Sequence, residues 1–263
     1  MVLEILGMRI FGLQSNKAPI GEVLRATGRD LLEQLHFETR NSHSEHMLGQ
    51  IVAASLTSGT HEDLARQLCL RLVEAIKRCK VYGWDFPDVI EALIKTFPVV
   101  ALDCLVGEDQ ETGYGSARNM FRDVRDNRPC PLEAIPEKVW LDWADAEPLF
   151  RYAKLAEVIK FSKTGDDEPS TGWSDMAEKL IASAPDPVKV LDIFFDRFYP
   201  TSWSGSRADI LASRLPMIEA LLHHERPEVV ERAKNKIPAF EAAISRERAS
   251  EAESDRQRDE SFE

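Results

Sequence analysis

The sequence predicts an all-α protein, and three observations support this fold class. Apolar residues recur at helical spacing in several segments, which is the pattern of a helix that buries one face. The pattern is found at Val89, Ile90, Leu93, Ile94 and Phe97, at Val188, Leu191, Phe195 and Phe198, and at Val230, Ala233, Ile237, Phe240 and Ile244. Helix-start signals precede many of these segments, whereas no clearly alternating stretch longer than about four residues favours a strand.

The first fifteen residues, MVLEILGMRIFGLQS, are apolar but are interrupted by Glu4 and Arg9. They lack a basic leading segment and are too short to span a bilayer, so they make a poor signal peptide or membrane anchor. An amphipathic helix or strand is the better interpretation. We expect residues 1–84 to form an N-terminal helical segment that continues a larger protein.

Farther along the chain, capping residues and prolines predict where helices begin. Thr60 with Asp63 and Ser206 with Asp209 each pair a capping hydroxyl with a carboxylate that suits the positive end of a helix. Asp186 can cap a helix whose first turn contains a proline, because that position needs no N–H partner. Prolines suited to the same first-turn position are Pro87, Pro136, Pro148, Pro187 and Pro227.

A second set of prolines, Pro98, Pro216 and Pro238, lies inside apolar runs. Each predicts a broken or kinked helix, because the ring removes one backbone hydrogen bond and crowds the preceding turn. Three of the first-turn prolines follow one another at intervals of 39 and 40 residues. Kinked helices at this interval resemble HEAT-type repeats, over residues 85–245. The resemblance implies an irregular HEAT-like helical-repeat solenoid, in which each helix pair packs on its neighbours.

Another resemblance rests on short strings in the second half of the chain, WLDWAD (140–145), SAPDPVKVL (183–191), SWSGS (202–206) and RDESFE (258–263). Together they resemble the C-terminal helical region of large bacterial proteins, some of which are associated with phage defence. The resemblance implies a helical fold and a C-terminal position, and it carries over no catalytic or binding residue. Residues 246–263 are mostly charged and polar, so we expect a solvated helical tail there.

Composition argues against several classes of partner and location. The 45 acidic and 33 basic side chains give a net charge of −12, which repels phosphate backbones and anionic lipids. We therefore expect neither nucleic acid nor a membrane as a partner. The four cysteines have neither CxxC spacing nor the density of a secreted disulfide framework, which favours the cytoplasm. Cys69 and Cys79 fall in an apolar helical pattern and are predicted to be buried core residues.

No set of residues predicts catalysis or metal binding. His36, His43 and His46 are close together in a segment with two glutamates, but HExxH is absent and the segment is interpreted as a polar surface loop. Nucleotide-binding loops and the GxSxG motif are also absent. We therefore expect no catalytic residue, metal or cofactor, and no enzyme. The alternative is an all-helical metal-dependent hydrolase or nuclease whose acids and histidines converge only in three dimensions.

Two features are candidate contacts for a protein partner. Arg118, Arg122 and Arg125 fall within about 60° of one another on a helical wheel. Such a stripe can pair bidentately with phosphate or with an acidic peptide, although a solvated face paired with neighbouring acids has the same pattern. Trp203, in the string SWSGS, is a candidate exposed interface residue.

These observations predict a non-catalytic scaffold or sensor region that binds other proteins, because solenoids present extended surfaces and no catalytic set stands out. We expect the partner to be a separate protein, or an effector domain that precedes this region in a larger bacterial defence protein.

Overall fold

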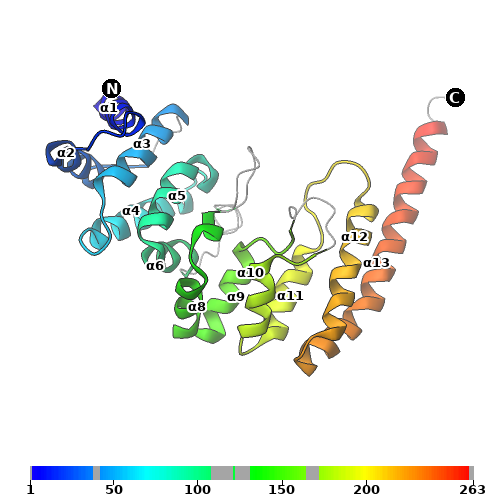
Figure 1. The fold of residues 1–263 in the computed structure, drawn as a ribbon. Coiled ribbons are helices and arrows are strands. Elements are labelled where there is room, and N and C mark those ends of the chain that lie inside the picture. Colours follow the sequence, from blue (N-terminus) through cyan, green and yellow to red (C-terminus); the bar gives the residue numbers. More distant parts are fainter. Residues whose placement is uncertain (1, 38–41, 108–120, 122–130, 164–171, 261–263) are drawn as a thin grey trace. The chain divides into compact units, whose positions relative to one another are not determined.

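The computed structural model describes residues 2–37, 42–107, 121, 131–163 and 172–260. Within these ranges the chain is mainly helical and contains no strand, only an isolated bridge between Ser162 and Trp173. The predicted all-α class is confirmed for this part of the chain. Contacts divide the chain into two compact units, Met1–Glu147 and Pro148–Glu263, and Figure 1 shows the helices of each in chain order.

The first unit is built from short and medium-length helices. They are α1 (Val2–Ser15), α2 (Glu22–Glu33), α3 (Ser42–Ser55), α4 (Glu62–Lys77), α5 (Pro87–Thr96), α6 (Pro98–Ala101) and α8 (Glu137–Ala146). A π-helical turn, Leu102–Val106, continues α6, and 3-10 turns cover Gly83–Asp85 and Pro131–Ala134.

The core of the first unit forms around α3, which packs against α1, α2 and α5. Ile51 and Val52 of α3 and Ile90 of α5 are completely buried. Burial of each such side chain contributes about 1.5–3 kcal/mol. Gly7 lets α1 approach α3 closely, because a Cβ at this position would lie 2.5 Å from that of Met47. Of the two forms predicted for the N-terminal stretch, a helix or a strand, the structure shows the helix.

Two helices of this unit, α1 and α4, end with a non-glycine residue in the left-handed region, Lys17 at φ 52° and Cys79 at φ 54°. After α4, the backbone N–H of Cys79 donates to the carbonyl of Ile76 at 2.9 Å, and that of Lys80 donates to Ala75 at 3.0 Å. This pair of bonds is the Schellman motif. Cys79 is exposed there, so the prediction that it is a core residue is wrong: it lies past the end of the apolar helix.

In the described part of the chain, the second unit consists of five α-helices, three of which begin at a side-chain cap. They are α9 (Pro148–Val158), α10 (Asp175–Ser183), α11 (Pro187–Arg197), α12 (Arg207–Ala220) and α13 (Pro227–Glu260). The Ser174, Asp186 and Ser206 side chains accept backbone hydrogen bonds of 3.0–3.1 Å at the starts of α10, α11 and α12. The starts predicted at Asp186 and Ser206 are confirmed.

Other predicted starts have mixed outcomes. Pro136 is the N-cap of α8 rather than its first helical residue. The start predicted at Thr60 is wrong by one position, because His61 is the N-cap of α4, and its side chain makes no capping bond. Four prolines do open helices as predicted, namely Pro87, Pro148, Pro187 and Pro227.

The interior prolines differ from one another. Pro98 separates α5 from α6, as predicted. Pro216 and Pro238 instead lie inside α12 and α13, which continue through them, so of the predicted break or kink the break does not occur at these two positions. The two helices pack along each other, and this tertiary packing compensates for the hydrogen bond that each ring removes.

Aromatic side chains form the core of the second unit. Phe161, Trp173, Phe194, Phe198 and Phe240 pack with centroid separations of 5.1–6.4 Å. The geometries are tilted or edge-on, which suits the charge distribution of aromatic rings. These contacts join α11 to α13 and to the segment between α9 and α10.

Two buried arginines complete this core. The guanidinium groups of Arg197 and Arg214 lie 5.2 and 5.4 Å from the centre of the Phe161 ring. Arg197 donates to the carbonyl of Ala156 and Arg214 to that of Phe198, both at 2.6 Å. Each guanidinium therefore fixes a carbonyl near a helix end as well as packing on an aromatic face.

Candidate functional site

The predicted partner-binding residues fall in two very different places. Arg118, Arg122 and Arg125 lie outside the described residues, so the arginine stripe stays a prediction. Trp203 precedes α12 and is 46% exposed. Its ring stacks against the guanidinium of Arg207 at 4.8 Å, which pairs the two side-chain types most enriched among interface hot spots.

Two acids from the far end of α13 hold the start of α12 beside Trp203. Glu251 accepts hydrogen bonds from the Ser206 hydroxyl at 2.8 Å and from the backbone N–H of Ala208 at 3.0 Å. Although burial acts to raise it, these bonds hold the pKa of Glu251 below its ordinary value. Glu247 pairs with Arg207 at 3.2 Å. The predicted tail is helical through Glu260 and mostly exposed, as expected, although Glu247 and Glu251 contact the start of α12.

A second surface is the outer face of α1, which we call the α1 face. Its four large apolar side chains are Val2, Ile5, Met8 and Phe11, exposed by 64, 57, 52 and 49%. They recur every three residues, on the side of the helix opposite the buried Leu6 and Ile10. The same spacing is visible in the sequence, but α1 is apolar on both sides, so the sequence alone could not show which side faces solvent.

A cluster of ionisable groups joins α3 to the start of α5. The carboxylate of Glu45, which is 6% exposed, accepts the backbone N–H groups of Asp88 at 2.7 Å and Val89 at 3.1 Å. Nδ1 of His46 lies 2.6 Å from the carboxylate of Asp88. The polar surface loop predicted around His46 is therefore wrong, because this residue lies in α3 and packs its ring edge-on to Phe11.

The environment of Glu45 favours its neutral form. Burial, together with the nearby carboxylate of Asp88, raises the pKa of Glu45 to about 7, against the opposing effect of its two backbone hydrogen bonds. A carboxyl that titrates near neutral pH is a common feature of general acids. Here, however, one carboxylate oxygen, Oε1, already caps α5 by accepting both N–H groups, so the simplest role of Glu45 is structural.

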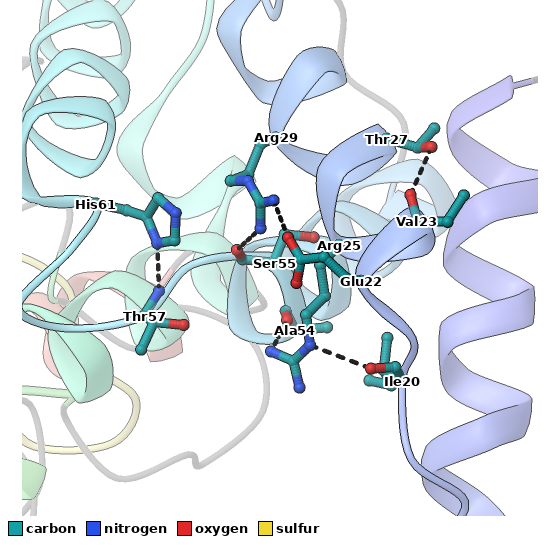
Figure 2. Close-up of polar contacts among 10 residues, drawn as sticks. All are labelled: Ile20, Glu22, Val23, Arg25, Thr27, Arg29, Ala54, Ser55, Thr57 and His61. Carbon is teal, nitrogen blue, oxygen red and sulfur yellow. Dashed lines mark hydrogen bonds and ion pairs between the residues drawn. The ribbon is translucent and has the colours of Figure 1, made fainter.

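Arginines of α2 satisfy the carbonyl groups at the end of α3. Figure 2 shows Arg25 donating to Ala54 at 2.7 Å and Arg29 donating to Ser55 at 3.2 Å. Arg29 also pairs with Glu22, seven residues or about two turns earlier in α2. Positive groups at the negative end of a helix stabilise it, so this arrangement fixes α2 on α3.

An open groove of about 600 Å³ runs between α9 and α11 of the second unit. Its polar groups hold the helices: Lys189 donates to the carbonyl of Leu149 at 3.1 Å, and Asp192 pairs with Arg232 at 2.5 Å. Asp186, at one end of the groove, caps α11. These groups are engaged in structural bonds, so the groove carries no proposal for chemistry.

The described ranges show neither a metal cluster nor a membrane-spanning helix. No three histidine, cysteine or acidic side chains in this part of the chain are arranged to share a metal ion. No helix in the same part is both long and apolar enough to cross a bilayer.

Comparison with family models, with curated proteins and with solved structures finds no match. The resemblances to HEAT repeats and to C-terminal regions of bacterial defence proteins therefore stay predictions. Function has to be argued from the surfaces described above.

Proposed function

We propose that this chain is a non-catalytic helical interaction module that associates with a second copy of itself through the α1 face. The carrying observation is that α1 presents Val2, Ile5 and Met8 to solvent, with the half-exposed Phe11 at the edge of the face against His46, while its opposite side is packed on α3. Exposed apolar patches of this kind are typical of interaction sites.

The charges beside the α1 face favour a second copy over an unrelated partner. On a helical wheel Ile5 and Met8 lie at the centre of the face, with Glu4 and Arg9 on opposite edges about 70° away. In a parallel pair of helices, each edge meets the opposite edge of the partner, offset by five residues. Glu4 and Arg9 have this spacing, so in a parallel pair each would lie opposite the unlike charge of the other copy.

The expected association is weak. Four apolar side chains cannot supply the ~800 Å² per partner of a standard interface, so we expect a dissociation constant on the order of 10–100 µM. No helix has to fold on association, because α1 is already held by α3. Gly12, which has open space around it, lets the two backbones approach closely.

The repeat character of the proposed module is supported by the spacing of its tertiary bonds. Within the first unit the indole of Trp143 donates to Asp103, 40 residues away. Within the second, Arg197 donates to Ala156 at a separation of 41 residues. Bonds at this recurring interval fit the HEAT-like period proposed from the prolines, in which each element contacts its counterpart in the preceding repeat.

Sedimentation of the full chain over a concentration series tests the association. We expect a concentration-dependent dimer that is lost in Ile5→Glu with Met8→Glu, because a buried interface cannot hold four unpaired carboxylates. The matched control is Val23→Glu, which changes the exposed apolar side chain of α2 that lies outside the α1 face. A wild-type chain that stays monomeric at every concentration contradicts the proposal.

Charge exchange tests the parallel orientation. Glu4→Arg or Arg9→Glu alone should weaken the dimer several-fold, and the double exchange should restore it, because opposite charges meet again. If the dimer of the double variant is destabilised by the sum of the effects of the two single changes, the two helices are not parallel in this register. If only a different protein binds the face, wild-type and control chains sediment as identical monomers.

A further inference from the structure

Two buried cysteines of the first unit lie against each other. Cys69 is in the middle of α4, and Cys104 is in the π-helical turn that packs on α4. Their side chains are 0 and 2% exposed, and the two thiols share a hydrogen bond. Neither cysteine is part of a disulfide in this structure.

An arginine lies next to one of the two sulfur atoms. Nη1 of Arg66, one turn before Cys69 on α4, is 3.6 Å from Sγ of Cys104. The Arg66 side chain is 46% exposed, so the group beside this buried sulfur is itself in contact with solvent. The other Nη of Arg66 reaches the carboxylate of Asp103 at 3.4 Å, which orients the guanidinium between the acid and the thiol.

This arrangement makes the two thiols chemically unequal. The hydrogen bond with Cys104, followed by burial and the negative charge on Cys104, raises the pKa of Cys69. A guanidinium beside a sulfur stabilises its thiolate. Because Arg66 lies beside its sulfur, Cys104 is assigned as the nucleophile, and Cys69 is the neighbour that reacts with it afterwards.

We propose that Cys104 and Cys69 are a dithiol modification site that a hydroperoxide oxidises to an intramolecular disulfide. π-Helical turns are frequent at functional sites, and the one here places Cys104 against α4. The site is independent of the α1 face, so its test and the test of self-association can fail separately.

The reaction proceeds in two balanced steps. The Cys104 thiolate attacks the peroxide, an S–O bond forms as the O–O bond breaks, and water leaves after the hydroxide takes up a proton. Sγ of Cys69 then attacks the sulfur of the sulfenic acid, an S–S bond forms as the S–O bond breaks, and a second water carries away the Cys69 proton. In sum, two thiols and one hydrogen peroxide give one disulfide and two waters, so the sulfurs lose the two electrons that the peroxide gains.

The test uses the full chain with its other two cysteines replaced, Cys79→Ser and Cys130→Ser, and hydrogen peroxide as the probe. We expect the intact mass to fall by about 2 Da and to return with dithiothreitol, and digestion to yield one linked peptide pair containing Cys69 and Cys104. Addition of oxygen atoms to both cysteines without a link overturns the proposal.

Single variants separate the roles of the two sulfurs. In Cys69→Ser the sulfenic acid should accumulate on Cys104 and be trapped by dimedone, whereas Cys104→Ser should react with neither reagent. Equal trapping in both variants contradicts the assignment of the nucleophile. Arg66→Gln, which keeps both thiols, should slow disulfide formation about tenfold because the thiolate loses its cation.

Melting curves of every variant identify any that fail to fold. If a cysteine variant does not fold, two measurements still decide the proposal: the linked peptides in the parent chain and the rate of disulfide formation in Arg66→Gln. Both of these chains keep Cys69 and Cys104. If the thiols react only at the rate at which the chain unfolds in the same buffer, the folded site is not the reactive species and the proposal is wrong.

Discussion

At the scale of single residues, Glu45 shows how a buried acid can stabilise a fold while its ionisation opposes it. Its carboxylate caps α5 through two backbone N–H groups, as a capping aspartate would, but it reaches them from another helix. The nearby Asp88 carboxylate disfavours a second negative charge. The pH dependence of stability therefore contains a contribution from this residue.

Replacing Glu45 by Gln should flatten that pH dependence. Because the pKa of Glu45 is raised to about 7 in the folded chain, from 4.5 without the fold, the folded state holds its proton more tightly. The free energy of unfolding should then fall as pH rises from about 4.5 to about 7. We expect Glu45→Gln to reduce this loss by about 1 kcal/mol, since solvent screens part of the charge.

Denaturant unfolding at pH 5 and pH 8 measures the effect of this replacement. The control is Glu219→Gln on the exposed side of α12. Parallel pH profiles for wild type and Glu45→Gln would contradict the role given to this carboxyl.

The sequence predicts residues whose partners are near in the chain far better than those whose partners are distant. Ser206 and Asp186 cap helices through N–H groups three residues away, so their role follows from local spacing. Glu45 and Glu251 cap helices 43 residues distant, and no local pattern encodes such a contact. For the same reason, no local pattern predicts that Cys69 and Cys104 lie against each other.

At the scale of secondary-structure elements, the ends of α1 and α4 have a strained backbone conformation that lowers the stability of the fold. A non-glycine residue in the left-handed region loses about 1–2 kcal/mol relative to a right-handed conformation, yet the Schellman bonds of both helices require this geometry. Glycine has no such penalty.

Cys79→Gly should therefore stabilise the protein. We expect the free energy of unfolding to rise by about 1 kcal/mol, because the helix end keeps its hydrogen bonds and loses its steric strain. Cys79→Val should lower it, since a β-branched side chain is the least tolerated in this region. Thermal melts under reducing conditions compare the three chains, and a destabilised glycine variant would refute this account.

Element boundaries were predictable where a proline or a cap marks them and less so where tertiary packing decides. Pro87 and Pro187 open helices, as their fixed backbone angle favours. Pro216 and Pro238 fail to end theirs, because α12 and α13 pack along each other and hold the helical path. The histidine-containing segment looked polar enough for a loop, and His36 does lie exposed outside a helix, but from Ser42 on burial of apolar residues on α1 and α5 makes it α3.

At the scale of the whole molecule, the sequence and the contacts divide the chain into different folding units. The sequence suggests boundaries after residues 84 and 245, and the contacts divide the chain between Glu147 and Pro148. A cut after residue 84 would separate Glu45 from the N–H groups that it binds and would expose the faces of α3 that pack on α5.

We expect the fragments 1–147 and 148–263 to fold separately and a fragment 1–84 to lose most of its helix. Each of the two larger fragments keeps its own buried core, such as the aromatic cluster around Phe198. Circular dichroism and cooperative melting of the purified fragments provide the measurement. A cooperative melt for 1–84 together with a disordered 1–147 would favour the boundary suggested by the sequence.

The recurring separation of the tertiary bonds has a consequence for the order in which the chain folds. The hydrogen bond of Glu45 cannot form until Val89, 44 residues later, has been added to the chain. That of Ala184 likewise requires Arg226, 42 residues later. The entropic cost of closing a loop depends only weakly on its length, so loops of such similar size face nearly the same barrier. During synthesis, each of these contacts becomes possible as soon as about forty further residues emerge, and none has to wait for the two ends of the chain to meet. Folding should therefore be rapid and progressive, starting from the N-terminal helices while the later ones are still being made.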